Sequence, residues 1–336
     1  MKKYFPILLS KAGELGALSK LSEKVKDEIT PILQILPDNM DSVITFSSNW
    51  DFSDNEIFID FSLFNNDISL IKRFISDLVN LNVNVIPVVY HGVNPEYIEL
   101  LKRLFLDNEI DKVCFRFSNN NEGFINFNNI LSEMLMSLEV VESQVSILLD
   151  FGLVDQNSYN NYAALAINII QSMHNSKDYI NIIISSGSFL ENLGSLYPAD
   201  RIYRLQRYEW NIWNLIITKL NQNNIRYSDY GVKYPYYTEA NFQGSCSIKY
   251  SVKGEYVIFR GEISSNHKDG NGQYITFANR LVNSNDYMGE EFSWGDEKIS
   301  FYAQQNMNDP KKKTGNAASW VEISQNHHLT MIYSLL

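Results

Sequence analysis

The sequence predicts an α/β protein, with a (β/α)8 TIM-like barrel over residues 1–238 and a C-terminal β-rich (α+β) extension over residues 239–336. Eight short apolar runs alternate with helical patterns over about 235 residues, which matches such a barrel in count and length. Most of these runs are apolar almost throughout, as in strands covered on both faces. After Gly231 the helical periodicity gives way to short alternating segments. An open doubly wound α/β sheet is the alternative, because periodicity alone does not show whether a sheet closes.

The predicted strands of the barrel share short length and β-branched residues, and they cover residues 4–9, 31–36, 57–61, 84–90, 112–117, 145–151, 180–186 and 225–230. Amphipathic helices are predicted between them over residues 13–28, 68–82, 95–107, 127–143, 159–176 and 207–224. Residues 38–55 carry the least regular of the helical patterns. The helix at residue 95 begins with a proline, which suits a first helical turn.

The C-terminal segments alternate apolar and polar residues and are predicted to be strands, over residues 245–252, 254–263, 273–282, 297–305 and 328–336. No linker rich in Pro, Gly or Ser separates them from Gly231. We therefore expect the extension to be integral to the fold, with the final apolar residues forming a buried strand.

Composition limits the class of protein further. Lys and Arg number 28, and Asp and Glu number 39, so the net charge of −11 argues against bulk binding to nucleic acid. Cys114 and Cys246 fit no metal or redox spacing. No stretch approaches the roughly 18 apolar residues of a membrane span, and the apolar part of the N-terminus is too short for a signal peptide. These features predict a cytoplasmic protein without a membrane partner.

Polar residues at strand ends are the first candidates for a site, because ligands of parallel barrels bind where strands end. They are Lys11, Glu14, Gln34, Asp60, His91, Arg116, Asp150, Ser185, Ser186 and Asp229. Asp60, Arg116 and Asp150 each interrupt an apolar run, and a buried charge is costly unless it is paired. Two interpretations stay open: an ion-pair network that plugs the barrel, or charges that surround a ligand. In the second, the carboxylates could transfer protons, bind a divalent cation or hold a polar ligand.

Three further segments carry candidate residues. Ser185 and Ser186 precede a Ser- and Gly-rich loop that could bind an anion at a helix start. Residues 204–213 are expected to open the last barrel helix, with Arg207 or Glu209 pointing toward the barrel mouth. Asn326, His327 and His328 stand just before the last apolar run. Because neighbouring strand residues point to opposite faces, at most one of the two histidines should face any one site.

Five segments together resemble the "beta protein" family, which is named for a bacteriophage protein and found in phages and bacteria. They are YFPILLSKAGELGALSKLSEKVKDEITPILQI, RLQRYEWNIW with RYSDYG, IKYSVKGEYVIFRGE and GNAASWVEISQNHHL. The W-x-x-I-x-x-NHH pattern is the most specific of these, whereas Gln34 departs from the acidic residue expected after the PIL run. The resemblance implies a setting in phage–bacterium conflict but no particular reaction. It singles out Lys11, Gly13, Glu14, Arg207, Glu209, Trp210, Asp229, Tyr230, Arg260, Trp320, Asn326, His327 and His328.

Two functions follow as expectations. The first is a sensor or recognition protein in phage–bacterium conflict, on the defence or the phage side, which binds a phage or host protein or a small anionic ligand at the barrel mouth. The second is a hydrolase or phosphodiesterase-like enzyme acting on a phosphorylated or nucleotide ligand. Its catalytic residues would be Glu14, Asp60, Asp150, His327 and His328. Its ligand-binding residues would be Lys11, Arg116, Ser185, Ser186, Arg207, Glu209, Asp229, Arg260 and Asn326. The sequence identifies no cofactor, and a divalent cation is one that the carboxylates could bind.

Overall fold

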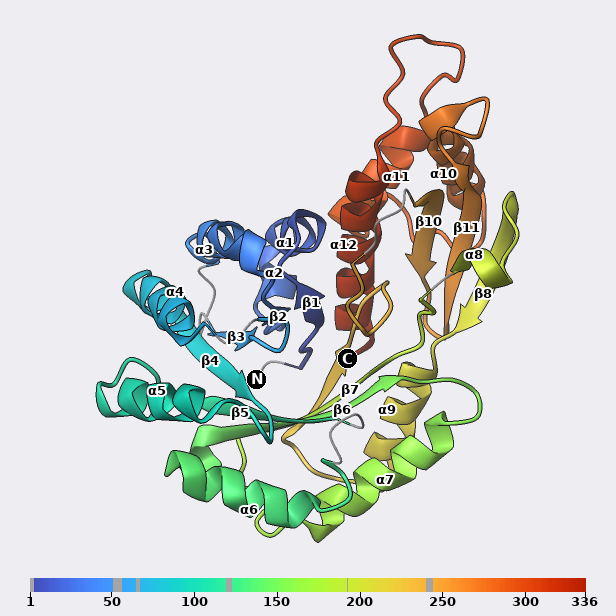
Figure 1. The fold of residues 1–336 in the computed structure, drawn as a ribbon. Coiled ribbons are helices and arrows are strands. Elements are labelled where there is room, and N and C mark those ends of the chain that lie inside the picture. The colour runs from blue at the N-terminus through green and yellow to red at the C-terminus, as the bar shows by residue number, and fades with distance from the viewer. Residues whose placement is uncertain (1–2, 51–55, 65–66, 119–122, 192, 240–243) are drawn as a thin grey trace. The chain divides into compact units, whose positions relative to one another are not determined.

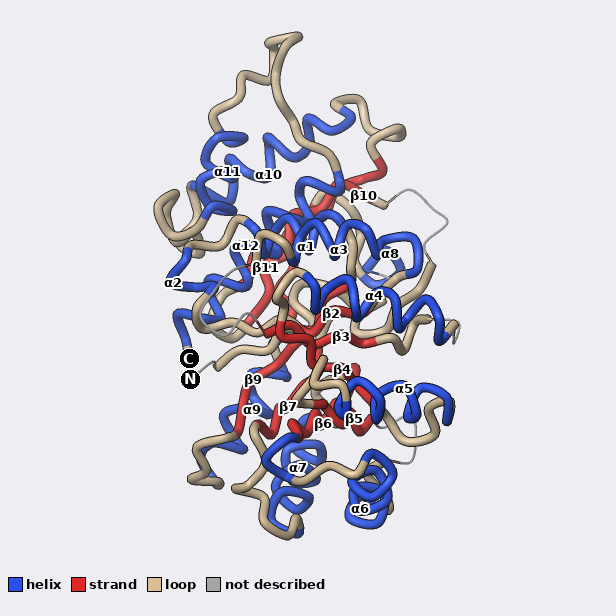
Figure 2. The backbone as a smooth tube through the Cα atoms, turned by 90° about the vertical axis from the view of Figure 1, so that its left-hand side faces the viewer, coloured by secondary structure: helices blue, strands red, loops and turns tan. Residues whose placement is uncertain are grey.

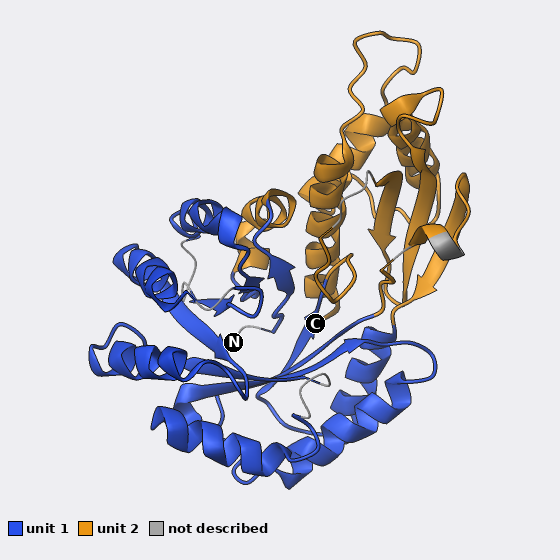
Figure 3. Ribbon diagram, viewed as in Figure 1, with its two compact units in different colours: residues 1–11, 27–187, 208–230 blue, residues 12–26, 188–207, 231–336 orange. Residues whose placement is uncertain are grey.

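The computed structural model describes residues 3–50, 56–64, 67–118, 123–191, 193–239 and 244–336. The chain forms two compact units, which Figure 3 shows in separate colours. Unit 1 contains residues 1–11, 27–187 and 208–230, and unit 2 contains residues 12–26, 188–207 and 231–336. The chain enters unit 2 after the carboxyl ends of three strands of unit 1. The boundary near residue 238 between barrel and extension stays a prediction.

Unit 1 is built on an eight-stranded parallel sheet in the order β1-β2-β3-β4-β5-β6-β7-β9. Its strands are β1 (Ile7–Leu9), β2 (Ile32–Gln34), β3 (Glu56–Asp60), β4 (Asn84–Val89), β5 (Val113–Ser118), β6 (Val145–Leu153), β7 (Asn181–Gly187) and β9 (Ile225–Asp229). Every barrel strand predicted from the sequence is confirmed within a few residues. Parallel neighbours require a crossover between successive strands, and the helical patterns of the sequence supply it.

The two ends of this sheet meet. Tyr4, just before β1, forms an isolated parallel bridge with Tyr227 on β9. The backbone N–H of Phe5 donates to the carbonyl of Tyr227 at 2.9 Å. The sheet is therefore nearly closed and barrel-like, and an open sheet with two free edges does not describe it (Figure 2).

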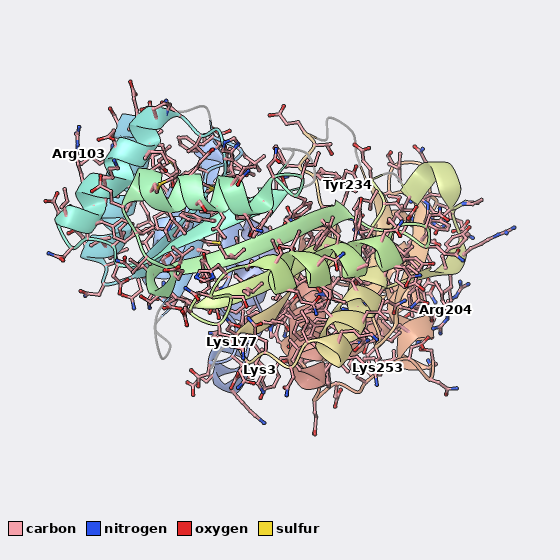
Figure 4. All side chains as sticks on the ribbon, turned by 90° about the horizontal axis from the view of Figure 1, so that it is seen from below. Lys3, Arg103, Lys177, Arg204, Tyr234 and Lys253 are labelled. Atoms are coloured by element: carbon pink, nitrogen blue, oxygen red, sulfur yellow. The ribbon has the colours of Figure 1, made fainter. Side chains whose placement is uncertain are left out.

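Helices of unit 1 lie outside the sheet, as Figure 1 shows for α4 to α7 and α9. They are α3 (Met40–Ser47), α4 (Ile68–Asn80), α5 (Pro95–Leu106), α6 (Phe127–Leu138), α7 (Tyr159–Ser172) and α9 (Tyr208–Lys219). The irregular pattern over residues 38–55 thus contains α3, although residues 51–55 lie outside the described part of the chain. The side chain of Asp67 caps α4, and that of Asn94 caps α5. Side chains fill the space between helices and sheet, while long basic ones such as Arg103 on α5 extend outward (Figure 4).

Unit 2 combines a small antiparallel sheet with helices. The sheet has the order β10-β11-β8, formed by β10 (Ser245–Ser251), β11 (Glu255–Ile263) and β8 (Arg201–Gln206). The helices are α1 (Ala12–Ser19), α2 (Glu23–Lys26), α8 (Leu193–Leu196), α10 (Gln273–Val282), α11 (Trp294–Ala303) and α12 (Ala317–Leu335). Unit 2 therefore contains both strands and helices, from three separate stretches of the chain.

Three predicted strands of the extension are wrong. Residues 273–282, 297–305 and 328–336 lie in α10, α11 and α12. Their β-branched and aromatic residues favour strands, but the buried positions follow helical spacing. In α10 these positions include Tyr274, Ala278 and Leu281, which share one helical face. Packing against the sheet outweighs the local propensity.

The expected helix start at residues 204–213 is also corrected. Residues 201–206 form β8, which pairs antiparallel with β11, and α9 begins only at Tyr208. Arg204 accordingly lies on a strand of unit 2, where its guanidinium contacts Glu255 at 2.8 Å and Asp286 at 2.6 Å. The chain thus changes from unit 2 to unit 1 within a few residues of Arg207.

Candidate functional site

Three charged side chains meet inside the sheet of unit 1. Asp60 ends β3, Arg116 lies on β5, and Asp150 lies on β6. Because β4 separates β3 from β5, Arg116 and Asp60 can touch only across the interior of the curved sheet. Asp60 and Asp150 are buried, and the side chain of Arg116 is 12% exposed. The charges that interrupt the apolar runs are therefore paired with one another.

Arg116 is the centre of this network. Its Nη1 donates to Oδ2 of Asp60, and its Nε and Nη2 donate to Oδ2 of Asp150 at 3.1 and 2.6 Å. The hydroxyl of Tyr230 donates to the same oxygen of Asp150 at 2.7 Å and accepts from Nη2 at 3.1 Å. Charge-assisted bonds of this kind are strong in a low-dielectric interior.

The second oxygen of each carboxylate is also occupied. Oδ1 of Asp60 accepts the backbone N–H of Ser62 at 2.8 Å. Oδ1 of Asp150 accepts the backbone N–H of Gly152 at 3.0 Å. Each carboxylate is thus fixed by the turn that follows its own strand as well as by Arg116.

The network shifts the pKa of Arg116 and that of the neighbouring Tyr90. Burial alone would lower the pKa of Arg116, but Asp150, Tyr230 and Asp60 outweigh it and hold that pKa well above its ordinary value. Burial, and then the charge of Asp60, raises the pKa of Tyr90 at the end of β4. The two carboxylates and one guanidinium carry a net charge of −1.

Buried polar side chains lie at the level of these charges. Gln34 is the register partner of Asp60, Ser185 that of Asp150, and Ser228 that of Ser185. Register partners on neighbouring parallel strands point to the same face. We call this set the polar layer; its members are Gln34, Asp60, Arg116, Asp150, Ser185, Ser228 and Tyr230. Within the described residues, Oε1 of Gln34 and the Oγ atoms of Ser185 and Ser228 are buried without a hydrogen-bond partner.

Asp229 does not join the polar layer. It follows Ser228 on β9, so its side chain points to the opposite face of the strand. Its carboxylate accepts the hydroxyls of Tyr4 at 2.6 Å and Tyr227 at 2.8 Å. Ser186, the register partner of Asp229, shares that face. This cluster contributes to the contact between the two ends of the sheet.

Other predicted residues of the barrel mouth are dispersed. Lys11 is exposed just after β1, and Glu209 is buried in the first turn of α9. The chain after β7 forms no long helix in its described part; the four-residue α8 follows instead. An anion was expected to bind at the start of a helix beside Ser185 and Ser186. The helix found there, α8, is too short to supply a helix dipole.

The residues predicted in unit 2 form other contacts. Glu14 lies 3.5 Å from Lys233. Arg260 donates to the carbonyl of Tyr197 at 2.5 Å and to the hydroxyl of Ser245 at 2.6 Å.

Arg207 is fully buried in unit 2. Its Nη1 lies 3.4 and 3.3 Å from the carbonyls of Val252 and Lys253, and its guanidinium lies over the ring of Tyr256. These contacts tie Arg207 to the turn between β10 and β11.

Asn326, His327 and His328 are fully buried on α12, and the expectation of a strand there is wrong. Nε2 of His327 donates to the carbonyl of Ser251 at 2.8 Å, and its Nδ1 lies 2.7 Å from Oδ2 of Asp296. Nδ1 of His328 lies 2.7 Å from the hydroxyl of Ser251. The two histidines thus bind neighbouring atoms of one residue, because a helix turns successive side chains by only about 100°. Both nitrogens of His327 are engaged, which favours a structural role.

Sequence reasoning found the charged members of the polar layer, and the family resemblance singled out Tyr230. It missed Ser228, although this buried residue lies on a predicted strand, two positions before Tyr230. It also missed Asp296, which no local pattern marks. Among the described residues, no group of three or more His, Cys, Asp or Glu side chains is arranged to hold a metal ion. No helix in the described part of the chain has both the length and the apolar character needed to cross a membrane.

A comparison with curated proteins finds no significant match. A comparison with family models gives a match to one described as Beta protein, over residues 4–334. The matched region includes the polar layer, the NHH group and both compact units. The chain therefore belongs to the Beta protein family.

Proposed function

We propose that the protein is a recognition protein in the conflict between phages and bacteria, and that it binds a small polar molecule in the polar layer of unit 1. One observation carries the proposal: among the residues that the structure describes, buried oxygens of Gln34, Ser185 and Ser228 have no hydrogen-bond partner beside a fully paired charge network. Leaving a buried polar group unpaired costs about 1–3 kcal/mol, so a molecule that pairs with these oxygens would bind favourably. The phage–bacterium setting rests on the resemblance of the sequence.

The pairing of the carboxylates favours recognition over hydrolysis. A general base needs a free oxygen within reach of a substrate, and every carboxylate oxygen of Asp60 and Asp150 already accepts a hydrogen bond. The net charge of −1 favours a ligand that donates hydrogen bonds over the anionic ligand expected from the sequence. Oε1 of Gln34 can accept a hydrogen bond from the ligand, and the hydroxyls of Ser185 and Ser228 can donate or accept one.

We also propose a specific barrel type for unit 1 and a cellular location for the protein. We take the nearly closed sheet to be a (β/α)8 barrel of the TIM type, in which the carboxyl ends of the strands carry the binding site. The polar layer lies at those ends, since Asp60 is the last residue of β3. The cytoplasm is the proposed location, on the basis of composition.

Native mass spectrometry of the full-length chain, purified under mild conditions, tests for a bound molecule. We expect a small-molecule adduct that is lost on denaturation, and its mass would direct a thermal-shift series with the identified compound. Ser185→Ala should reduce the thermal shift by the equivalent of about tenfold in affinity, since 1.4 kcal/mol corresponds to that factor.

Ser146→Ala is the matched control. Ser146 is also a buried serine of the same sheet, but it lies at the amino end of β6 and contacts Asn181. It should change stability without changing ligand affinity. Turnover of a nucleotide or phosphoester by the wild type, abolished by Asp150→Asn, would instead support the hydrolase.

A further inference from the structure

Unit 2 contains a cavity of ≈ 580 Å³ whose walls come from three separate segments. One wall is formed by residues 20–22, which follow α1. The second is formed by residues 290–294 and Glu297, which lead into α11. Thr330 on α12 forms the third. This volume lies in the range of pockets that hold small molecules.

Two aromatic side chains line this cavity, and one of them contacts ammonium groups. The Nζ of Lys20 lies 4.2 Å from the ring centre of Trp294, and that of Lys298 lies 5.6 Å from it. Phe292 lines the same cavity. Tryptophan is the side chain that binds cations best through its ring face.

Carboxylates surround these rings. Glu290, Glu291 and Glu297 line the cavity and are exposed, whereas Lys20 is the single cationic residue of the lining. Three carboxylates and one ammonium give the lining a formal charge of −2, and the ammonium of Lys298, 2.9 Å from Oε1 of Glu297, lies beside the same tryptophan. Such a balance attracts cations and repels anions.

The NHH group fixes the walls in place. Oδ1 of Asn326 accepts the backbone N–H of Gly295 at 2.9 Å, and its Nδ2 donates to the carbonyl of Ala17 at 2.9 Å. One side chain thus joins α1, α11 and α12. The hydroxyl of Thr330 donates to the carbonyl of Asn326 at 3.0 Å, which places this lining residue one turn along α12.

His327 supports the aromatic wall from behind. It contacts Asp296, which also accepts the hydroxyl of Ser293 at 2.6 Å. The ring of Phe292 lies 5.6 Å from the imidazole. The segment that carries Phe292, Ser293 and Trp294 is therefore bound to buried groups on its inner side and faces the cavity on the other.

We propose that this cavity binds an organic ammonium ion, with Trp294 as the aromatic platform and Glu297, Glu290 and Glu291 supplying the opposite charge. The ammonium of Lys20 lies over the ring of Trp294, and a ligand ammonium takes its place there. Asn326 and His327 act as positioning residues, because they hold the walls without lining the cavity.

Isothermal titration calorimetry of the full-length chain with choline tests the proposal. The neutral isostere 3,3-dimethylbutan-1-ol has the same shape without the charge, so it should bind at least about tenfold more weakly. Trp294→Leu should weaken choline binding by a similar factor, and Trp294→Phe by less. Glu297→Gln should weaken it a few-fold and reduce its dependence on salt.

Lys20→Ala should change the affinity for choline in the opposite direction to the Trp294 and Glu297 variants. Removing the resident ammonium should strengthen choline binding several-fold, an effect that damage to the fold would not produce. Glu133→Gln, at an exposed glutamate of α6 in unit 1, should leave binding unchanged. Equal binding of choline and its neutral isostere, or no binding of choline at millimolar concentration, would overturn the proposal.

Discussion

The ring of Tyr250 stacks on the imidazole of His327, with ring centres 3.8 Å apart and planes inclined by 20°. Both residues also bind Asp296, since the Tyr250 hydroxyl donates to its Oδ1 at 2.8 Å. These contacts join strand β10, the start of α11 and helix α12 in the core of unit 2. His327→Ala should therefore cost at least about 2 kcal/mol, because it opens a cavity in the core and removes a hydrogen-bond partner of the buried Asp296. Urea unfolding measures the loss, and the exposed His174→Ala should be neutral.

The charge network of unit 1 should respond differently to single and combined changes. Arg116→Met leaves two buried carboxylates facing each other and should cost about 3–5 kcal/mol. Replacing Asp60, Arg116 and Asp150 together by apolar residues of similar volume should cost much less, because no charge is left unpaired. Guanidinium unfolding of the single and triple variants compares them. Equal losses in both would show that the charges contribute little beyond packing.

Lys249 predicts a pH dependence of stability. Burial lowers the pKa of this ammonium to about 8 from 10.5, against the opposing charge of Glu14. Between these two values the unfolded chain binds the proton and the folded chain does not, so this residue makes stability rise with pH from about 8 to 10.5. Below pH 8 Lys249 is charged in both the folded and the unfolded chain, and folding then carries the full cost of burying that charge.

Lys249→Met should consequently stabilise the protein at pH 7 by roughly 1–2 kcal/mol, a discounted value because the side chain is only half-buried. The advantage should shrink as the pH approaches 10.5. Unfolding of both forms across this range gives the difference directly. An advantage that stays constant with pH would contradict the assigned cause.

Gly295 lies where α11 approaches α12. A Cβ at this position would come 2.5 Å from the carbonyl oxygen of Ile323 and 3.0 Å from the backbone N of His327. Because both neighbours are backbone atoms, Gly295→Ala should separate the helices and cost at least about 2 kcal/mol. Gly244→Ala has open space around the new methyl and should be neutral. Thermal unfolding of the two variants distinguishes them.

Removing residues 320–336 should give an insoluble or strongly destabilised product. This deletion takes away most of α12, including Trp320, which is 1% exposed and stacks on Tyr274 at 5.1 Å. Loss of a buried tryptophan alone costs about 3–5 kcal/mol. Solubility and circular dichroism of the truncated chain provide the measurement. A soluble product with an unchanged unfolding temperature would contradict this role for α12.

The sequence predicts the barrel strands well because each is a buried parallel strand with an apolar signal of its own. Asp60, Arg116 and Asp150 stand out for the same reason, as charges in such runs. Periodicity fails at residues 273–282, where aromatic and β-branched residues favour a strand locally but the sheet of unit 2 needs a covering helix. Contacts between distant segments, such as Asn326 with Ala17, leave no local pattern at all.

Helices α1 and α12 are far apart in the sequence, yet Lys20, just after α1, pairs with Glu322 on α12 across 302 positions, and Gly16 lies against that same side chain. The ribosome therefore completes α1 long before its binding partner exists. Until α12 is synthesised, the face of α1 that carries Gly13 and Gly16 has no α12 to cover it, so unit 2 can become complete only after that point. A long search for so distant a contact also slows folding. Translation products that lack α12 would thus leave this face of α1 uncovered, and chaperones or proteases could bind there.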